Sequence, residues 1–224
     1  MIQTGGPFVH CGFRNLRWSS LCQRALSRLK RLRDLLWSSL CPSDKISLSS
    51  EEEKMLFYII RHAIAEPLGE ANDFSDERRT LTPAGRDRMQ RIAKGLKRLS
   101  VEFDLVLTSP LLRAVETAEI LVTEMGASRD LIKRTDALAP GASFAPLFEE
   151  IRRYPELESL AVVGHQPGLG DLVSLLVVGQ PGALALDLKK GSVCLVKVER
   201  TIPVFRGKMA WLLAPKQLRL IAKA

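Results

Sequence analysis

The feature that most constrains the fold is an alternation of short apolar runs with helix-like segments, which begins at Met55. Residues 55–60, 104–108 and 160–164 are apolar runs of strand length, and segments with helical spacing of apolar side chains lie between them. Strands that alternate with helices favour a parallel sheet covered by helices on both faces. We therefore predict an α/β fold, namely a three-layer α/β/α sandwich with a mainly parallel central sheet.

Two predicted helices begin with the same pair of residue types, a capping hydroxyl followed by proline. Thr82 starts a helix over residues 82–99, and Ser109 starts another over residues 109–125. The remaining pattern predicts a strand at 131–134, a helix at 144–153, a helix that opens at Pro167, and late strands at 193–199 and 208–213 that suit a hairpin.

Reactive side chains stand where the three strongest strand-like runs end. Arg61 and His62 follow the first run, Arg113 lies shortly after the second, and His165 follows the third. The chain has only 3 histidines, and two of them occupy these positions. Because the carboxyl ends of parallel strands meet at one edge of a sheet, we expect the four side chains to lie close together.

Two arginines and two histidines in one small volume favour a phosphate as ligand. The helix amino ends at Pro110 and Pro167 are expected to face the same edge, and such ends attract anions. Taken singly, a histidine after a strand is more often a structural hydrogen-bond partner, and an arginine in a first helical turn more often makes a surface contact. The joint pattern therefore carries the prediction of a phosphate pocket.

Four segments, in order along the chain, add sequence signatures to this pattern. They are Arg61-His62-Ala63, Arg79-Thr80-Leu81-Thr82-Pro83-Ala84-Gly85, Ser109-Pro110-Leu111-Leu112-Arg113-Ala114 and Val163-Gly164-His165-Gln166-Pro167. Over about residues 55–215 they resemble the histidine phosphatase superfamily, and its SixA-type phosphohistidine phosphatases in particular, which implies a phosphoglycerate mutase-like fold. The chain departs from the signature at Ala63, where the family has glycine, so we expect a backbone conformation there that a residue with a Cβ can adopt.

The resemblance implies a phosphatase that needs neither a metal nor a cofactor. Neutral His62 would attack phosphorus and form a phosphohistidine intermediate, which water then hydrolyses. Arg61, Arg113 and His165 would bind the phosphoryl oxygens and the charge that develops on them. Arg79 is expected either to touch the ligand or to hold the loop that follows His62.

The substrate class depends on how the leaving group obtains its proton. Asp136 is the only acid of the loop at residues 135–141, and a capping or turning role is favoured for it over that of general acid. A phosphoramidate needs less help than an ester, because an imidazole nitrogen protonates readily, so we expect phosphohistidine in a phosphorylated protein. Two alternatives stay open: a small phosphomonoester as substrate, or a catalytically silent phospho-ligand binding module, against which the intact His62 and His165 argue.

Residues 1–54 differ from the remainder of the chain and show no strand alternation. We predict a basic, poorly ordered extension with one amphipathic helix at residues 21–40, followed by a histidine phosphatase domain at residues 55–224. Sequence added upstream by a mis-set start codon, with Met55 as the natural beginning, is the favoured interpretation. Contact with an anionic membrane surface through residues 21–40 and a targeting role are the alternatives.

The formal net charge of +8 suits an anionic substrate, a nucleic acid or an acidic surface. A nucleic-acid partner is disfavoured, because residues 55–224 lack a basic stripe with interleaved aromatic residues. The 4 cysteines show no spacing typical of a zinc site. Reduced thiols, and hence a cytoplasmic location, are the simplest interpretation.

Overall fold

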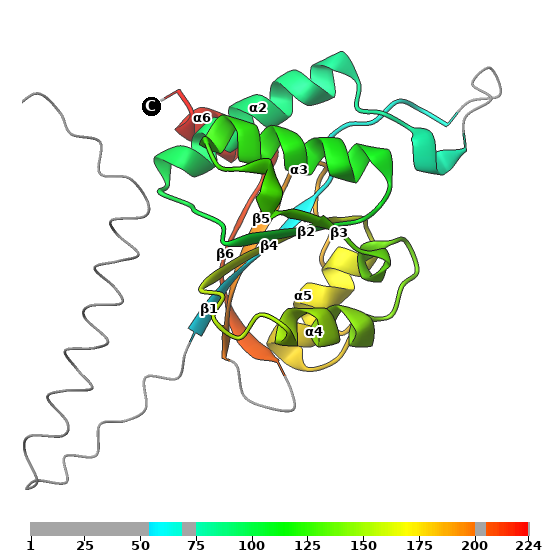
Figure 1. Cartoon of the computed structure of the whole chain (residues 1–224), viewed down its shortest axis with the longest axis vertical. Helices are drawn as coiled ribbons and strands as arrows, with labels where there is room; N and C mark the ends of the chain where they lie inside the picture. The colour runs from blue at the N-terminus through cyan, green and yellow to red at the C-terminus, as the bar shows by residue number, and fades with distance from the viewer. Residues whose placement is uncertain (1–53, 69–74, 200–204, 224) are drawn as a thin grey trace, which may run out of the picture. The chain divides into compact units, whose positions relative to one another are not determined.

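The computed structural model describes residues 54–68, 75–199 and 205–223 (Figure 1). In this part of the chain, strands form one sheet in the order β3-β2-β4-β1-β5-β6. They are β1 (Lys54–Arg61), β2 (Leu105–Thr108), β3 (Ile132–Arg134), β4 (Ser159–Gly164), β5 (Val193–Glu199) and β6 (Arg206–Leu213). Neighbours among the first four pair in parallel, whereas β5 is antiparallel to both β1 and β6. The prediction of a mainly parallel sheet is thus confirmed, and the late strands form the expected hairpin.

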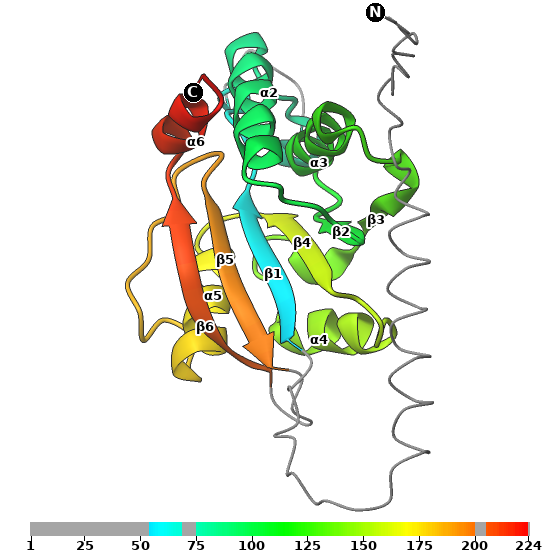
Figure 2. The same ribbon diagram turned by 90° about the vertical axis from the view of Figure 1, so that its left-hand side faces the viewer.

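Helices cover both faces of the sheet (Figures 1 and 2). One face carries α2 (Pro83–Arg98), α3 (Leu112–Met125) and α6 (Pro215–Ile221), and the other carries α4 (Phe144–Arg152) and α5 (Gly168–Val178). The connections contain the short 3₁₀ turns η1 (Asp76–Arg78), η2 (Arg129–Leu131) and η3 (Asp136–Leu138). This arrangement confirms the predicted three-layer α/β/α sandwich.

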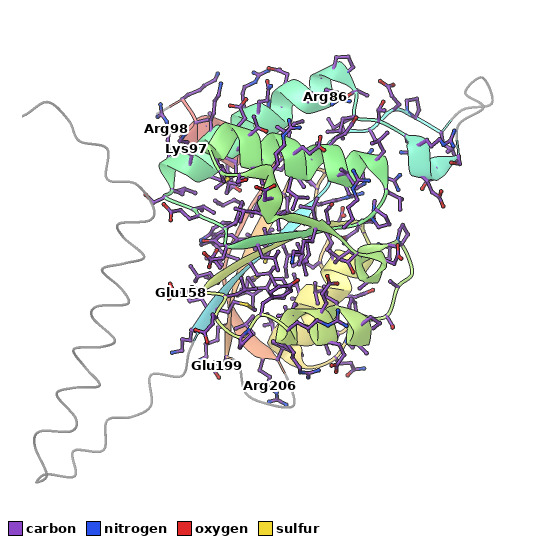
Figure 3. The ribbon with its side chains drawn as sticks, in the orientation of Figure 1. Arg86, Lys97, Arg98, Glu158, Glu199 and Arg206 are labelled. Carbon is purple, nitrogen blue, oxygen red and sulfur yellow. The ribbon has the colours of Figure 1, made fainter. Side chains whose placement is uncertain are left out.

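Alternating side chains of the central strands build a separate core on each face, as the strand geometry requires. In β1, Tyr58 and Ile60 pack under α2 and α3, whereas Phe57 and Ile59 pack under α4 and α5. Side chains fill the space between the sheet and both helical layers, while charged residues such as Arg86 and Lys97 lie on the outside (Figure 3). Burial of each large apolar side chain stabilises the fold by about 1.5–3 kcal/mol, so the sheet holds its strand ends in fixed positions.

The predicted start of α2 is confirmed, whereas α3 begins later in the chain than predicted. Thr82 caps α2, because its Oγ1 accepts a hydrogen bond of 2.9 Å from the Gly85 amide. The prediction that Ser109 caps the next helix is wrong: α3 begins three residues later, at Leu112, and the residue at its cap makes no side-chain hydrogen bond. The Ser109 hydroxyl accepts a hydrogen bond of 3.4 Å from the Leu111 amide, before α3 begins, and also contacts His165.

Helix α6 was not predicted, since its seven residues are too few to show a helical period. Its start is stabilised by the Gln217 side chain, which accepts a hydrogen bond of 2.7 Å from the Ala214 amide. Buried Leu218 packs α6 against α2, where Gly95 permits a close approach: a Cβ at Gly95 would clash with the Leu218 carbonyl. Packing against another helix, rather than the local pattern, therefore accounts for α6.

The predicted extension at residues 1–54 lies outside the described residues apart from Lys54, and so does its amphipathic helix at residues 21–40. The division of the chain at Met55 therefore stays a prediction. Across the described ranges, no helix is long and apolar enough to span a bilayer.

Candidate active site

The structure brings together the side chains that follow β1 and β4. In the parallel pairing of these strands Arg61 lies beside Gly164, and the His62 amide donates a hydrogen bond of 3.1 Å to the Gly164 carbonyl. The rings of His62 and His165 consequently lie with their centroids 5.0 Å apart. Arg113 reaches them from the first turn of α3, and we call Arg61, His62, Arg113 and His165 the histidine site.

The His62 ring is held in one tautomer by its own backbone. Nδ1 lies 2.7 Å from the Ala63 carbonyl oxygen, and because a carbonyl only accepts, Nδ1 carries the hydrogen. Nε2 therefore keeps its lone pair. The Ala63 amide donates to Thr117 Oγ1 over 3.0 Å, and the Thr117 hydroxyl donates over 2.7 Å to the Arg113 carbonyl. A threonine of α3 thus fixes both the turn after His62 and the helix that carries Arg113.

The alanine that replaces the signature glycine causes no backbone strain. Within the described ranges, Ser100 is the one non-glycine residue with a positive φ, so Ala63 does not adopt a conformation that favours glycine. Its side chain is 3% exposed and belongs to the core beneath α2 and α3. The expectation that this position accepts a Cβ is confirmed.

Both histidines of the site are neutral near pH 7. Burial lowers the pKa of His62 to about 3, although its hydrogen bond to the Ala63 carbonyl opposes the shift; the charges of His165, Arg113 and Arg61 lower it further. Burial likewise lowers the pKa of His165 to about 4, together with the charge of Arg113, while Asp76 opposes that shift. The low proton affinity keeps the lone pair of His62 available for reaction.

Asp76, which belongs to none of the sequence motifs, binds the Arg113 side chain. The two terminal nitrogens of Arg113 donate to the Asp76 carbonyl and carboxylate over 2.7 and 3.0 Å. Burial alone would raise the pKa of Asp76, but the hydrogen bonds and charges of Arg113 and Arg79 hold it below its ordinary value. No sequence signal marks this residue, because a lone acid in a loop is typical of exposed surface.

Arg79 ties together the loop that follows His62. Its Nε donates over 2.9 Å to the Glu66 carbonyl, and its Nη1 forms an ion pair of 2.6 Å with Asp76. These contacts connect residues on both sides of the undescribed residues 69–74, and through Asp76 they reach Arg113. Of the two expectations for Arg79, its contacts favour holding the loop.

Two nitrogens of the histidine site are buried and have no hydrogen-bond partner within the described residues: Arg61 Nε and His165 Nδ1. Arg61 Nε is a donor, and His165 Nδ1 is one in the tautomer in which Nε2 accepts from the Ser109 hydroxyl. Other nitrogens of the same two side chains do have partners. Arg61 Nη1 donates to the Leu188 carbonyl and lies 3.5 Å from Asp187, and His165 Nε2 lies 2.9 Å from Ser109 Oγ. Buried donors normally have acceptors, so this arrangement suits a ligand with several anionic oxygens.

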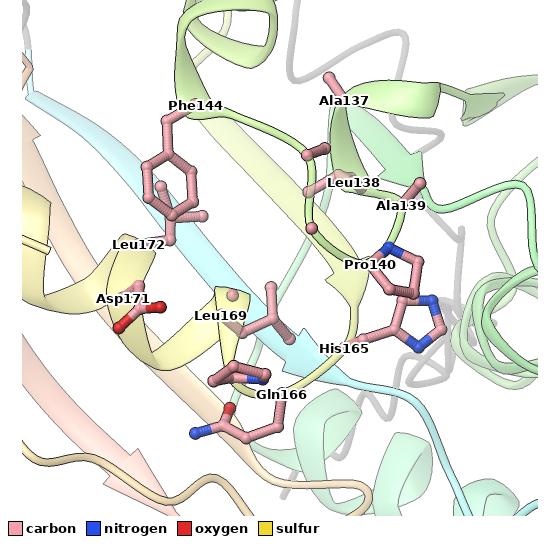
Figure 4. Close-up of a pocket in the computed structure, with 14 residues that line it drawn as sticks. Ala137, Leu138, Ala139, Pro140, Phe144, His165, Gln166, Leu169, Asp171 and Leu172 are labelled. Carbon is pink, nitrogen blue, oxygen red and sulfur yellow. The ribbon is translucent and has the colours of Figure 1, made fainter. Parts of the chain in front are cut away.

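A cavity of about 260 Å³ opens beside His165, between residues 137–144 and the start of α5 (Figure 4). Most of its lining is apolar, no lysine or arginine contributes, and its one carboxylate belongs to Asp171. We call it the apolar pocket. Asp136 is exposed and is not among the residues that line it, although its neighbour Ala137 is.

The arrangement of potential metal ligands within the described residues does not favour a metal site. Among the residues that the structure describes, no group of three or more His, Cys, Asp or Glu side chains could hold a metal ion. The polar groups of the histidine site are instead hydrogen-bond donors and neutral imidazoles, which suit an oxyanion.

Comparison with known proteins agrees with this architecture. The model of the histidine phosphatase superfamily (branch 1) matches residues 57–139. An uncharacterized protein of Picosynechococcus sp. is 37% identical over 143 residues, which make up 62% of this chain and 82% of that protein. The protein histidine phosphatase SixA, solved with tungstate, superposes with a TM-score of 0.63 at 26% identity over 73% of this chain and 99% of SixA.

A second group of relatives is named for another activity. The mitochondrial serine/threonine-protein phosphatase Pgam5 of Drosophila mojavensis is 32% identical over 107 residues, which are 47% of this chain and 37% of Pgam5. The chain therefore matches only about a third of that protein.

The sheet, the histidine pair and these matches together define the class: the chain belongs to the histidine phosphatase superfamily. Within it, the structure is SixA-like. Members of this superfamily are phosphatases, so the chain is a hydrolase of phosphoryl groups.

Proposed function

We propose that this protein hydrolyses phosphohistidine in other proteins, without a metal, and that His62 is the nucleophile. The observation that carries the proposal is the hydrogen bond from His62 Nδ1 to the Ala63 carbonyl. It leaves the lone pair on Nε2, and the pKa of about 3 keeps that lone pair unprotonated at neutral pH. We also propose that the catalytic unit is residues 55–224.

The reaction proceeds in two displacements at phosphorus. First, a bond forms between His62 Nε2 and phosphorus while the bond from phosphorus to the substrate imidazole breaks, and the leaving nitrogen takes up a proton from solvent. Water then attacks the phosphorylated His62, the bond from Nε2 to phosphorus breaks, and inorganic phosphate leaves. After the first step the His62 ring carries the phosphoryl group on Nε2 and its hydrogen on Nδ1, so the ring is cationic. Breaking the bond from Nε2 to phosphorus returns it to the neutral imidazole, and no oxidant, metal or cofactor enters the balance.

Arg61, Arg113 and His165 stabilise the charge on the phosphoryl oxygens. The unpartnered Arg61 Nε and His165 Nδ1 support this assignment, because each is a buried donor that an anionic oxygen would satisfy. His165 donates from Nδ1 when the Ser109 hydroxyl donates to Nε2, which their separation of 2.9 Å permits. Arg113 adds a permanent charge that Asp76 orients.

Asp136 and Asp76 are both poorly placed or poorly suited to protonate a leaving group, which favours phosphohistidine over an ester as substrate. Asp136 is exposed and does not line the apolar pocket beside His165. Asp76 is nearer, but two arginines hold its pKa low, so it stays ionised and is poorly suited to donate a proton. An imidazole leaving group needs less assistance than an alkoxide, and the similarity to SixA supports the same substrate class.

Phosphoserine and phosphothreonine in proteins are the competing substrates, because Pgam5 is named a serine/threonine-protein phosphatase. Such esters require a proton donor for the alkoxide, and neither exposed Asp136 nor ionised Asp76 suits that role. The two substrate classes therefore predict different rates in the same assay.

The test compares a phosphohistidine-bearing protein, a phosphoserine peptide and p-nitrophenyl phosphate, with the full chain in the presence of EDTA. We expect release of phosphate from phosphohistidine to be fastest, unaffected by EDTA and lost in His62→Asn. Faster release of phosphate from the phosphoserine peptide would mean that phosphomonoesters, and not phosphohistidine, are the substrates. Activity that disappears with EDTA and returns with added metal would contradict metal independence, and a folded protein without any activity would favour a phospho-ligand binding module.

A further inference from the structure

A second cavity, of about 470 Å³, adjoins the histidine site at Arg61 and differs in chemistry from the apolar pocket. We call it the basic pocket. Six of its lining residues are cationic, and a single one, Asp187, is acidic. The cations are Arg61, Arg88, Lys189, Lys190, Lys216 and Arg219.

These cations come from four separate segments that the fold brings to one place. Arg61 ends β1, Arg88 lies on α2, the two adjacent lysines precede β5, and the last pair lies on α6. Helices α2 and α6 pack side by side beyond the carboxyl end of β1, where β5 begins (Figure 2). The basic pocket therefore lies at the same edge of the sheet as His62.

The positive charge of the basic pocket is largely uncompensated. Within the described residues, the ion pair of Arg61 with Asp187 is the pocket's one internal pair, and Lys189, Lys190 and Lys216 form no ion pair. All three lysines are exposed. Like charges held close together repel one another, so an anionic ligand would relieve repulsion as well as add attraction.

We propose that the basic pocket binds an acidic segment of the substrate protein, next to the residue whose phosphoryl group His62 accepts. This inference rests on the proposed function, because it treats the ligand as part of a phosphoprotein. In this proposal the basic pocket selects the partner protein, and the histidine site carries out the reaction.

The arrangement fits several carboxylates on a chain better than one compact anion. The lysine ammonium groups are exposed and spread over different segments, whereas a cradle for a single phosphate would have converging, buried donors. Asp187 shows where a carboxylate sits: its side chain is 81% exposed and its oxygen lies 3.5 Å from Arg61. An acidic residue of the partner can take that position when Asp187 turns toward solvent.

The experiment measures fluorescence anisotropy of two unphosphorylated hexapeptides, one rich in Asp and Glu and one with Asn and Gln at the same positions. The full chain is compared with the double variant Lys189→Gln/Lys216→Gln. A matched control, Lys197→Gln/Lys208→Gln, removes the same charge from exposed positions of β5 and β6 outside the pocket. Variant Asp187→Asn removes the competing carboxylate.

We expect the acidic peptide to bind better than the neutral one. Its binding should weaken as salt rises from about 0.05 to 0.5 M, because the Debye length shortens and exposed charges are screened. The pocket double variant should weaken binding roughly three- to tenfold, as expected for two exposed ion pairs, and the control less than about twofold. Asp187→Asn should strengthen it roughly twofold. Equal binding of both peptides, or equal loss in both double variants, would overturn the proposal.

A second arm ties the pocket to turnover, with phosphohistidine peptides that have acidic or neutral flanks. We expect kcat/KM to favour acidic flanks and the pocket variant to reduce that preference; peptide binding without such a preference would overturn the substrate role. Pyrophosphate binding in place of acidic-peptide binding would overturn the class of partner. The anisotropy measurement needs no phosphohistidine. Acidic-peptide binding without any hydrolysis would therefore contradict the proposed function alone, whereas hydrolysis without such binding would contradict this inference alone.

Discussion

The histidine site and the basic pocket share Arg61, yet they differ in how their polar groups are held. His62 and Arg113 are 6% and 5% exposed, and hydrogen bonds to Ala63 and Asp76 fix their side chains. The lysines of the basic pocket are exposed and have no ion-pair partners within the described residues. Buried groups in fixed geometry suit bond-making at phosphorus, whereas exposed charges suit recognition of a partner that approaches from solvent.

From this comparison we expect substitutions in the histidine site to reduce activity or stability strongly, and substitutions of exposed charged residues to reduce them only slightly. The largest effect is expected for Arg113→Lys, which keeps the charge but loses the planar fork that binds two oxygens at once. We expect kcat to fall roughly a hundredfold, as for loss of one positioned donor. Steady-state kinetics checks this, with Arg91→Lys on the exposed face of α2 as the matched control; an equal effect of both variants would contradict the comparison.

The pH dependence of stability tests the burial of His62. In the unfolded chain its pKa is about 6.5, so between pH 6.5 and 3 the unfolded state binds more protons than the folded state. The contribution of neutral His62 is therefore fully present above pH 6.5 and is lost as the pH falls toward 3. Between pH 7 and 5 we expect a loss on the order of 2 kcal/mol from this residue.

Urea unfolding of the full chain and of His62→Asn at both pH values measures that contribution. The variant should lose less stability on acidification than the unchanged protein does. Nitrogen-15 chemical shifts of His62 should also show the Nδ1–H tautomer unchanged from pH 7.5 to 5. A His62 that titrates near pH 6.5 would mean that the site is open to water.

Thr117→Val tests the support beneath the histidine site. The change leaves the Ala63 amide buried without an acceptor and removes the hydrogen bond to the Arg113 carbonyl. We expect a loss of about 1–3 kcal/mol in the free energy of unfolding, together with lower kcat. Thr123→Val, at an exposed position of the same helix, is the control and should change stability by less than about 0.5 kcal/mol.

The smallest effect is expected at Asp136. Its side chain is exposed in η3 and does not line the apolar pocket, so Asp136→Asn should change kcat for phosphohistidine less than about twofold, as for other surface changes. The same variant should also leave the pH profile of kcat unchanged. A large loss with an ester substrate alone would identify Asp136 as its proton donor and favour the phosphomonoester alternative.

The histidine site could be anticipated from the sequence because its parts follow strands. The exits of β1 and β4 fix Arg61, His62 and His165 at one edge, and α3 brings Arg113 there, so local pattern and parallel topology were sufficient. Asp76 was missed, because only the folded loop brings it to Arg113. The role of Ser109 was mistaken, since a serine before proline has the pattern of a cap whether or not it contacts a histidine.

The basic pocket was hidden from the sequence for a different reason. Its cations are separated by many residues, and two of them lie on α6, whose short length gave no periodic signal. The net charge of +8 indicated an anionic partner without indicating where it would bind. Charges that converge only through helix packing need the folded structure to be recognised.

Capture of the phosphorylated intermediate is the most direct test of His62 as the nucleophile. The full chain is mixed with a phosphohistidine-bearing protein labelled in its phosphoryl group, quenched in alkali within milliseconds to seconds, and digested for mass spectrometry. We predict a base-stable, acid-labile phosphoryl group on the peptide that contains His62, and none in His62→Asn. A phosphoryl group on His165 instead, or turnover without any phosphorylated enzyme, would contradict the assignment of His62 as the nucleophile.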